Sequence, residues 1–300
     1  MLTLTILGNN SALPAHGRNP TAQILQGDNF SALIDCGEGT QWQIKKYKIK
    51  TGKLKYIFIS HLHGDHYFGL IGLLTSFSLN NRTEVLHIFC PPKLEEILNL
   101  QFTVASSHLT YEIYFHPLHG EAEIVNDGNL QVKSFKMNHR IECWGFVFRE
   151  IKNVRNVLPD KTASFEIPIE FYPKLQQGHD YVTPKGTIIP NEEVTTAAEA
   201  GKSYGFCGDT LYEENIVKHI SGLDMLYHET TFLKEMADKA KERFHSTTVD
   251  AGMIAKKAAV KRLIIGHFSS RYDDLENFLL ETQAVFKETS LAIEGTCFKI

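Results

Sequence analysis

The sequence predicts a single α/β domain in which layers of β-sheet lie between layers of helix. Size is one reason, because 300 residues with 43% hydrophobic composition can bury a large core within one domain. The order of elements is another, because strands come first in clusters and later alternate with helices. A proline-rich stretch interrupts this order at residues 152–201. We therefore expect one domain over residues 1–300, with an inserted arm at residues 152–201.

The individual elements follow from two kinds of periodicity. Runs rich in β-branched or aromatic residues between glycine-marked turns predict strands at residues 2–7, 22–25, 31–35, 56–60, 86–89, 130–137, 143–149, 203–207, 225–229, 262–266 and 291–295. Apolar residues at helical spacing predict helices at residues 66–79, 92–100, 211–220, 247–259 and 273–289. The stretch at residues 152–201 carries five prolines and few long apolar runs, which predicts a protruding loop.

Composition excludes several classes of protein. No stretch approaches the roughly 18 apolar residues that span a bilayer, and the start of the chain lacks the features of a signal peptide. We therefore expect a cytoplasmic protein without a membrane partner. The five cysteines are far apart and form no C-x-x-C pair, which argues against disulfides and against a thiolate zinc site. We expect these cysteines to be buried, together with Trp42 and Trp144.

The net charge limits how the chain can bind a nucleic acid. A net charge of −4 gives no overall attraction, so an RNA partner would need a local basic surface. The best candidate is residues 45–55, which hold six lysines in eleven positions. Lys45, Lys46 and Lys48 are therefore candidate substrate contacts. The alternative is a solvated helix end and turn, because charge runs usually lie on the surface.

A metal-binding pattern follows the strand predicted at residues 56–60. Four side chains of ligand type lie within the sequence SHLHGDH, namely His61, His63, Asp65 and His66. Side chains two apart in an extended strand point the same way, so His61 and His63 can share one ion. Gly64 allows a turn that brings Asp65 and His66 round to a second ion. Imidazole and carboxylate donors without thiolate suit zinc and tolerate manganese or cobalt.

Further ligands are needed, because four side chains from one loop cannot complete two metal sites. Three candidates stand at the ends of predicted strands: His139, Asp209 and His267. Ligands from strand ends converge along one rim of a layered fold. A carboxylate has two oxygens and can bridge two cations, so Asp209 is the natural bridge.

These residues together resemble the metallo-β-lactamase superfamily, with its H-x-H-x-D-H motif followed by His, Asp and His. The resemblance covers nearly the whole chain and implies a four-layer αββα sandwich with an inserted protruding arm. Within the superfamily, the chain is similar to the short-form ribonuclease Z family. The specific motifs are HETTF at residues 228–232, FHST at residues 244–247 and HFSSRY at residues 267–272.

The resemblance also implies roles for particular residues. Two zinc ions per subunit would be held, the first by His61, His63, His139 and Asp209, the second by Asp65, His66, Asp209 and His267. Asp65 would accept the proton of the attacking water. Glu229 and His245 would form a pair near the leaving group. Arg271, in the HFSSRY motif, is a further candidate substrate contact.

The implied activity is hydrolysis of precursor tRNA by a homodimer. The enzyme would remove the 3′ trailer and leave a 3′-hydroxyl on the tRNA and a 5′-phosphate on the trailer. Family arms grip the tRNA elbow, but residues 150–202 hold six basic residues against eight acidic ones. We therefore expect the arm not to act as a basic clamp.

Two other functions are compatible with the motifs. The first is another enzyme on the same scaffold, a phosphodiesterase, arylsulfatase or lactonase acting on a small molecule, because fold does not fix substrate. The second is a noncatalytic RNA-binding protein with a relic site. Retention of all seven candidate ligands argues against the second function.

Overall fold

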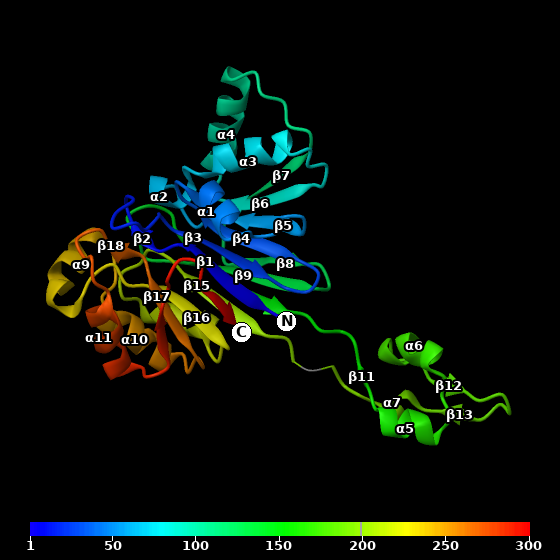
Figure 1. Ribbon diagram of the computed structural model, residues 1–300. Coiled ribbons are helices and arrows are strands. Elements are labelled where there is room, and N and C mark those ends of the chain that lie inside the picture. Colours follow the sequence, from blue (N-terminus) through cyan, green and yellow to red (C-terminus); the bar gives the residue numbers. More distant parts are fainter. Residues whose placement is uncertain (199) are drawn as a thin grey trace.

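The structure, a computed structural model, describes residues 1–198 and 200–300, and it is built around two seven-stranded sheets (Figure 1). The first sheet has the strand order β20 (Cys297–Lys299), β1 (Thr3–Gly8), β3 (Ala22–Gln26), β4 (Ser31–Cys36), β5 (Leu54–Phe58), β6 (Leu86–Cys90) and β7 (Ile113–Pro117). The second has the order β19 (Thr289–Leu291), β17 (Leu263–Gly266), β16 (Met225–Glu229), β15 (Ser203–Cys207), β10 (Trp144–Glu150), β9 (Leu130–Lys136) and β8 (Ala122–Asn126).

Buried apolar side chains form three clusters, one between the two sheets and one between each sheet and the helices that cover it, so the fold has four layers. The central cluster joins the inner faces of the two sheets and includes Ile6, Phe58 and Phe146. A second cluster lies under α1 (Thr40–Lys46), α3 (Leu70–Leu79) and α4 (Lys93–Val104), on the outer face of the first sheet. A third lies under α8 (Val217–Ile220), α10 (Thr248–Lys257) and α11 (Glu276–Val285), on the outer face of the second sheet. The predicted four-layer αββα sandwich is therefore confirmed.

Parallel pairing places the ends of several strands side by side. In the first sheet β4 runs parallel to β5, and β5 to β6. In the second sheet β15, β16 and β17 are parallel neighbours. Parallel strands end at the same edge of a sheet, so the residues that follow β5, β15 and β17 reach a common rim. A short parallel pair, β2 (Asn10–Ser11) with β18 (Phe268–Ser269), brings the amino-terminal loop to this rim.

Several predicted element boundaries are wrong. The helix expected at residues 66–79 is divided into α2 (Gly64–Tyr67) and α3, because the N–H of Gly69 donates to the carbonyl of Cys36 at 2.9 Å, outside the helix. The helix expected at residues 211–220 begins at η2 (Glu214–Ile216) and continues as α8. The helix expected at residues 273–289 is shorter, covering α11 alone. The strand expected at residues 291–295 is instead β19, and the chain then turns with Gly295 at φ +81°.

Residues from the arm range form a small separate body away from the two sheets (Figure 1). It contains β11 (Asn156–Val157), α5 (Pro159–Ser164), η1 (Ile169–Phe171), α6 (Tyr172–Gln176), β12 (Tyr181–Val182), β13 (Ile188–Ile189), α7 (Asn191–Val194) and β14 (Thr195–Thr196). Four buried side chains give it an apolar cluster of its own: Ile167, Leu175, Ile189 and Val194. Glu199, which also falls in the predicted arm, lies outside the described residues.

Two expectations about burial are wrong in part. Trp144 is fully buried, but Trp42 is 72% exposed, because α1 directs Gln43 and Ile44 into the core and Trp42 away from it. Cys297 is exposed on the edge strand β20, whereas the other four cysteines are buried. In the part of the chain that the structure describes, no helix has the length and apolar character required to cross a membrane.

Candidate metal centre

The SHLHGDH segment leaves β5 in extended form and turns into α2. His63 has φ −76° and ψ 144°, and it caps the helix that begins at Gly64. A Cβ at Gly64 would lie 2.2 Å from the exposed Phe68 ring, so a larger residue there would displace that ring. The turn brings Asp65 and His66 back toward His61, as the sequence predicted.

The first set of donor atoms comes from three imidazoles and one carboxylate. His63 Nδ1 lies 3.0 Å from His61 Nε2 and 3.1 Å from His139 Nε2. Asp209 Oδ2 lies 3.5 Å from His61 Nε2 and 3.7 Å from His139 Nε2. These four atoms therefore surround one point.

The second set uses the other oxygen of the same carboxylate. Asp209 Oδ1 lies 3.4 Å from His66 Nε2 and 3.2 Å from His267 Nε2. Asp65 Oδ2 lies 3.5 Å and 3.3 Å from the same two nitrogens. The structure thus brings all seven predicted ligands together and places Asp209 between the two sets.

Both sets fit a divalent metal ion. Ligand atoms about 2.1 Å from a tetrahedral zinc ion lie about 3.4 Å from one another, which is close to the separations in each set. His66 Nε2 and Asp209 Oδ1 are buried, and neither has a hydrogen-bond partner among the described residues. A buried polar atom without a partner is costly, and a bound cation would satisfy both atoms.

The pKa values of two of these histidines favour metal binding. Burial is the main cause that lowers the pKa of His61 to about 3 and that of His63 to about 4. Both imidazoles are therefore neutral at pH 7. The neutral form has the free lone pair that a metal ion requires.

Asp35, at the end of β4, orients two of the ligands, and we did not single it out from the sequence. Its Oδ2 accepts hydrogen bonds from His66 Nδ1 at 2.7 Å and from Ser60 Oγ at 2.8 Å. Ser60 Oγ in turn lies 3.0 Å from His61 Nδ1. Asp35 is fully buried and has φ 55°. Asp35 is the last residue of the strand predicted at residues 31–35, and this position was the available sign.

A second buried carboxylate, Glu229 at the end of β16, holds His245. The distance from His245 Nδ1 to Glu229 Oε1 is 2.9 Å. Burial would lower the pKa of His245, but the carboxylates of Glu229, Asp209 and Asp65 together outweigh burial and raise that pKa to about 9. Burial would raise the pKa of Glu229, but His245 lowers it. The pair therefore carries a proton on the imidazole at pH 7.

A cavity of about 400 Å³ opens over the donor atoms. Its lining includes His63, Asp65, Asp209 and His245, together with the loop that follows β2. In that loop the backbone N–H of Ala12 donates to Asp65 Oδ2 at 2.8 Å. Donor atoms of both sets and His245 of the Glu229–His245 pair can therefore be reached from the same cavity.

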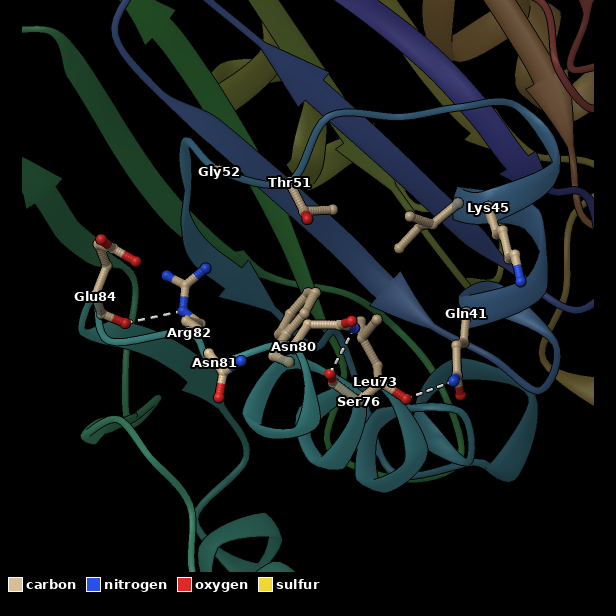
Figure 2. A pocket seen from close by; sticks show the side chains of 12 residues that line it. Gln41, Lys45, Thr51, Gly52, Leu73, Ser76, Asn80, Asn81, Arg82 and Glu84 are labelled. Carbon is tan, nitrogen blue, oxygen red and sulfur yellow. Dashed lines mark hydrogen bonds between the residues drawn. The ribbon is translucent and has the colours of Figure 1, made fainter.

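The predicted substrate contacts do not line this cavity. Arg140, which follows His139 directly, lines it, whereas Arg271 and the three lysines are not among its lining residues. Lys45 instead lines a separate cavity of about 570 Å³ between α1 and α3 (Figure 2). Sequence reasoning missed Arg140, and its position next to a predicted ligand was the sign that was available.

Comparison with known proteins decides the family. The chain is 40% identical over 299 residues to ribonuclease Z of Bacteroides fragilis, and the match covers 99% of this chain and 98% of that protein. The chain belongs to the ribonuclease Z family. Residues 2–161 also match the profile of a family described as Anti-Pycsar protein Apyc1.

Solved structures agree with this family and with the fold. Human tRNase Z, short form, superposes with a TM-score of 0.73 at 28% identity, and 99% of each chain is covered. A metallo-β-lactamase fold protein of Bacillus subtilis superposes with a TM-score of 0.70 at 18% identity, covering 99% of this chain and 98% of that chain. The ribonuclease Z family, this fold and the clustered donors identify the chain as a metal-dependent hydrolase that uses a divalent ion.

Proposed function

We propose that this chain is a zinc-dependent endoribonuclease that removes the 3′ trailer from precursor tRNA. The tRNA would keep a 3′-hydroxyl, and the trailer would carry a 5′-phosphate. One observation carries the proposal: residues of both donor sets, including the shared Asp209, line the same cavity as His245, which Glu229 holds. The relatives named ribonuclease Z, which match over the full length, support the choice of an RNA substrate.

Zinc ions at the two donor sets would supply Lewis-acid activation of water and would neutralise charge on the phosphate. The first set would comprise His61, His63, His139 and Asp209, and the second Asp65, His66, Asp209 and His267. Manganese or cobalt would fit the same donors. Asp65 lines the cavity, and its carboxylate is held by Ala12. We assign it the acceptance of a proton from the attacking water.

His245 would protonate the departing oxygen. A ribose 3′-oxygen is a poor leaving group and needs a proton as its bond to phosphorus breaks. His245 lines the cavity, and the Glu229 carboxylate keeps its Nδ1 occupied, which leaves Nε2 free to donate. Glu229 is the positioning residue for this imidazole and also keeps it charged.

RNA binding outside the cavity would use the arm and a basic surface. The small body that contains β11 to β14, residues 156–196, extends away from the two sheets, so it can reach a part of tRNA remote from the cleaved bond (Figure 1). Lys45, Lys46 and Lys48 are exposed on and beside α1 and can contact phosphates. Arg271 is likewise exposed and is a further candidate contact. We also propose that the protein is a cytoplasmic homodimer.

The second candidate function is hydrolysis of a small phosphodiester, because the same donor sets suit other phosphodiesters and the fold does not fix the substrate. The deciding experiment incubates the purified protein with a trailer-bearing precursor tRNA, with cyclic nucleotides and with a lactone. We expect a new 3′-hydroxyl on the tRNA and a 5′-phosphate on the trailer. Hydrolysis of a cyclic nucleotide without cleavage of the precursor would reject the tRNA assignment and support the second candidate.

A further inference from the structure

The hydroxyl of Thr231 lies between the second donor set and the Glu229–His245 pair. Thr231 Oγ1 is 2.7 Å from Glu229 Oε2 and 2.9 Å from His267 Nδ1. It is also 3.2 Å from His245 Nδ1, a ring nitrogen that has a closer partner in Glu229 Oε1 at 2.9 Å. Thr231 is 2% exposed, so water does not replace these contacts.

The protonation of Glu229 and of the hydroxyl determines which atom donates in each of these hydrogen bonds. Glu229 is an ionised carboxylate and accepts only, so the single hydroxyl proton of Thr231 points to Oε2. The lone pairs of Thr231 Oγ1 are then available to accept a proton from His267 Nδ1. With its proton on Nδ1, His267 presents an unprotonated Nε2 to Asp65 and Asp209. The hydroxyl thereby selects the tautomer that can bind a metal ion.

We propose that Thr231 is a positioning residue for the second metal ion, acting through the tautomer and orientation of His267. This inference rests on the proposed zinc centre and does not depend on the RNA substrate. His267 has φ 61°, in the left-handed region, a strained backbone conformation that contacts with the surrounding structure must hold. Among the described residues, Thr231 is the hydrogen-bond partner of its Nδ1.

The backbone of Thr231 makes hydrogen bonds of its own. Its N–H donates to Glu229 Oε2 at 2.9 Å, and its carbonyl accepts from the N–H of Ser269 at 3.1 Å. Replacing the hydroxyl by a methyl group therefore removes the hydrogen bonds of Thr231 Oγ1 to Glu229 and His267 and leaves the two backbone bonds in place. Thr231→Val is the test variant, and Thr231→Ser restores the hydroxyl and is the matched control.

The first donor set has an equivalent hydroxyl that provides a second control. Ser60 Oγ lies 3.0 Å from His61 Nδ1 and donates to Asp35 Oδ2 at 2.8 Å. Ser60→Ala removes the same kind of contact from a histidine of the other set. The two variants should therefore weaken different ions.

The experiment measures zinc bound per chain against free zinc, buffered with a chromogenic chelator, for the wild-type protein and the three variants. We expect two zinc ions in the wild type and in Thr231→Ser. In Thr231→Val, the affinity of one ion should fall about 10- to 100-fold while the other ion is unchanged, as is typical for loss of an outer partner of a ligand. Ser60→Ala should weaken the ion that Thr231→Val leaves unchanged. Equal affinities in Thr231→Val and wild type would overturn the proposal.

A second measurement uses the wild-type holoprotein and does not depend on variant folding. Long-range ¹H–¹⁵N spectra of labelled histidine report which ring nitrogen carries the proton. We expect His267 to be protonated at Nδ1, and protonation at Nε2 would overturn the proposal. Precursor tRNA is assayed in parallel. A wild-type protein that binds two zinc ions but does not cleave the RNA would contradict the proposed function and leave the role of Thr231 supported.

Discussion

Asp35 in the first sheet and Glu229 in the second each bind one imidazole directly and another through a hydroxyl group. Asp35 contacts His66 at 2.7 Å and reaches His61 through Ser60. Glu229 contacts His245 at 2.9 Å and reaches His267 through Thr231. Both carboxylates are fully buried at the end of a strand. We refer to them as the Asp35 network and the Glu229 network.

The two networks differ in the surroundings of the imidazole that the carboxylate binds directly. The His66 side chain is fully buried, and its Nε2 faces Asp209. The His245 side chain is 11% exposed and lines the cavity. The same arrangement of carboxylate, hydroxyl and two imidazoles therefore supports two proposed metal ligands in one network. In the other it supports one proposed ligand and one proposed proton donor.

The largest effect should come from the proton donor of the Glu229 network. We expect His245→Ala to slow cleavage of precursor tRNA by about 10²–10⁴-fold, the usual contribution of general acid catalysis. Hydrolysis of bis(nitrophenyl) phosphate should fall far less, because nitrophenolate leaves without a proton. The measurement is kcat/KM on both substrates, with zinc content checked. Equal losses on both would assign His245 to support of the metal site or the fold.

His219→Ala is the matched control for this prediction. His219 also faces a carboxylate, with its Nε2 3.4 Å from Glu121 Oε1, but it does not line the cavity. Both activities of this control should stay within about twofold of the wild type, since substitutions away from special features have small effects.

A different pattern is expected from the Asp35 network. Asp35→Asn should weaken zinc binding by about 10- to 100-fold, because it removes the acceptor that orients His66 and, through Ser60, His61. At limiting zinc, both substrates should lose activity together, and excess zinc should restore much of it. Zinc titration and kinetics at several zinc concentrations check this. A loss confined to the RNA substrate would show that the two networks do not differ as proposed.

Asp127→Asn is a suitable control for Asp35→Asn. Burial would raise the pKa of Asp127, but hydrogen bonds from Tyr56 and Lys55 outweigh burial and lower it to about 2. Asp127 is thus a second carboxylate with strong local partners, and it does not line the cavity. Its replacement should lower thermal stability and leave zinc affinity unchanged.

Glu229→Gln should have a smaller effect than His245→Ala. A glutamine keeps an oxygen for the hydrogen bonds from Thr231 or His245, but it cannot hold the proton on His245 by charge. RNA cleavage should fall by about 10-fold or more, less than for His245→Ala, and the nitrophenyl substrate should again be less affected. Loss of both zinc ions from this variant would make Glu229 part of the metal centre instead.

The candidate metal ligands were the easiest part of the site to predict from sequence. His61, His63, Asp65 and His66 are close together in the chain, and the remaining candidates follow strands that sequence periodicity locates. That they bind metal stays a prediction. Asp35 was harder, because its partner His66 is 31 residues away and their contact depends on the pairing of β4 with β5. Thr231 was harder still, since its hydroxyl acts across 36 residues.

The layers of the fold were predictable, and their details depended on close contacts. The four-layer sandwich follows from the order of strands and helices together with the family resemblance. The break before α3 depends on a hydrogen bond from the N–H of Gly69 to the carbonyl of Cys36, which no periodicity reveals. Trp42 was expected in the core because of its size. It is exposed because the short helix α1 buries a different face.

The smallest expected effect concerns contacts outside both networks and tests whether RNA binding is separable from them. Replacing Lys45, Lys46 and Lys48 together by glutamine should flatten the dependence of precursor tRNA binding on salt by about two to three units of slope, because each lysine–phosphate contact releases about one counterion. Hydrolysis of the nitrophenyl substrate should not change. The matched control replaces three other exposed lysines, Lys256 on α10, Lys287 after α11 and Lys299 on β20. An unchanged slope in the first variant would move RNA contact away from α1, to the arm or to a partner subunit. A flattened slope in both variants would show a nonspecific charge effect.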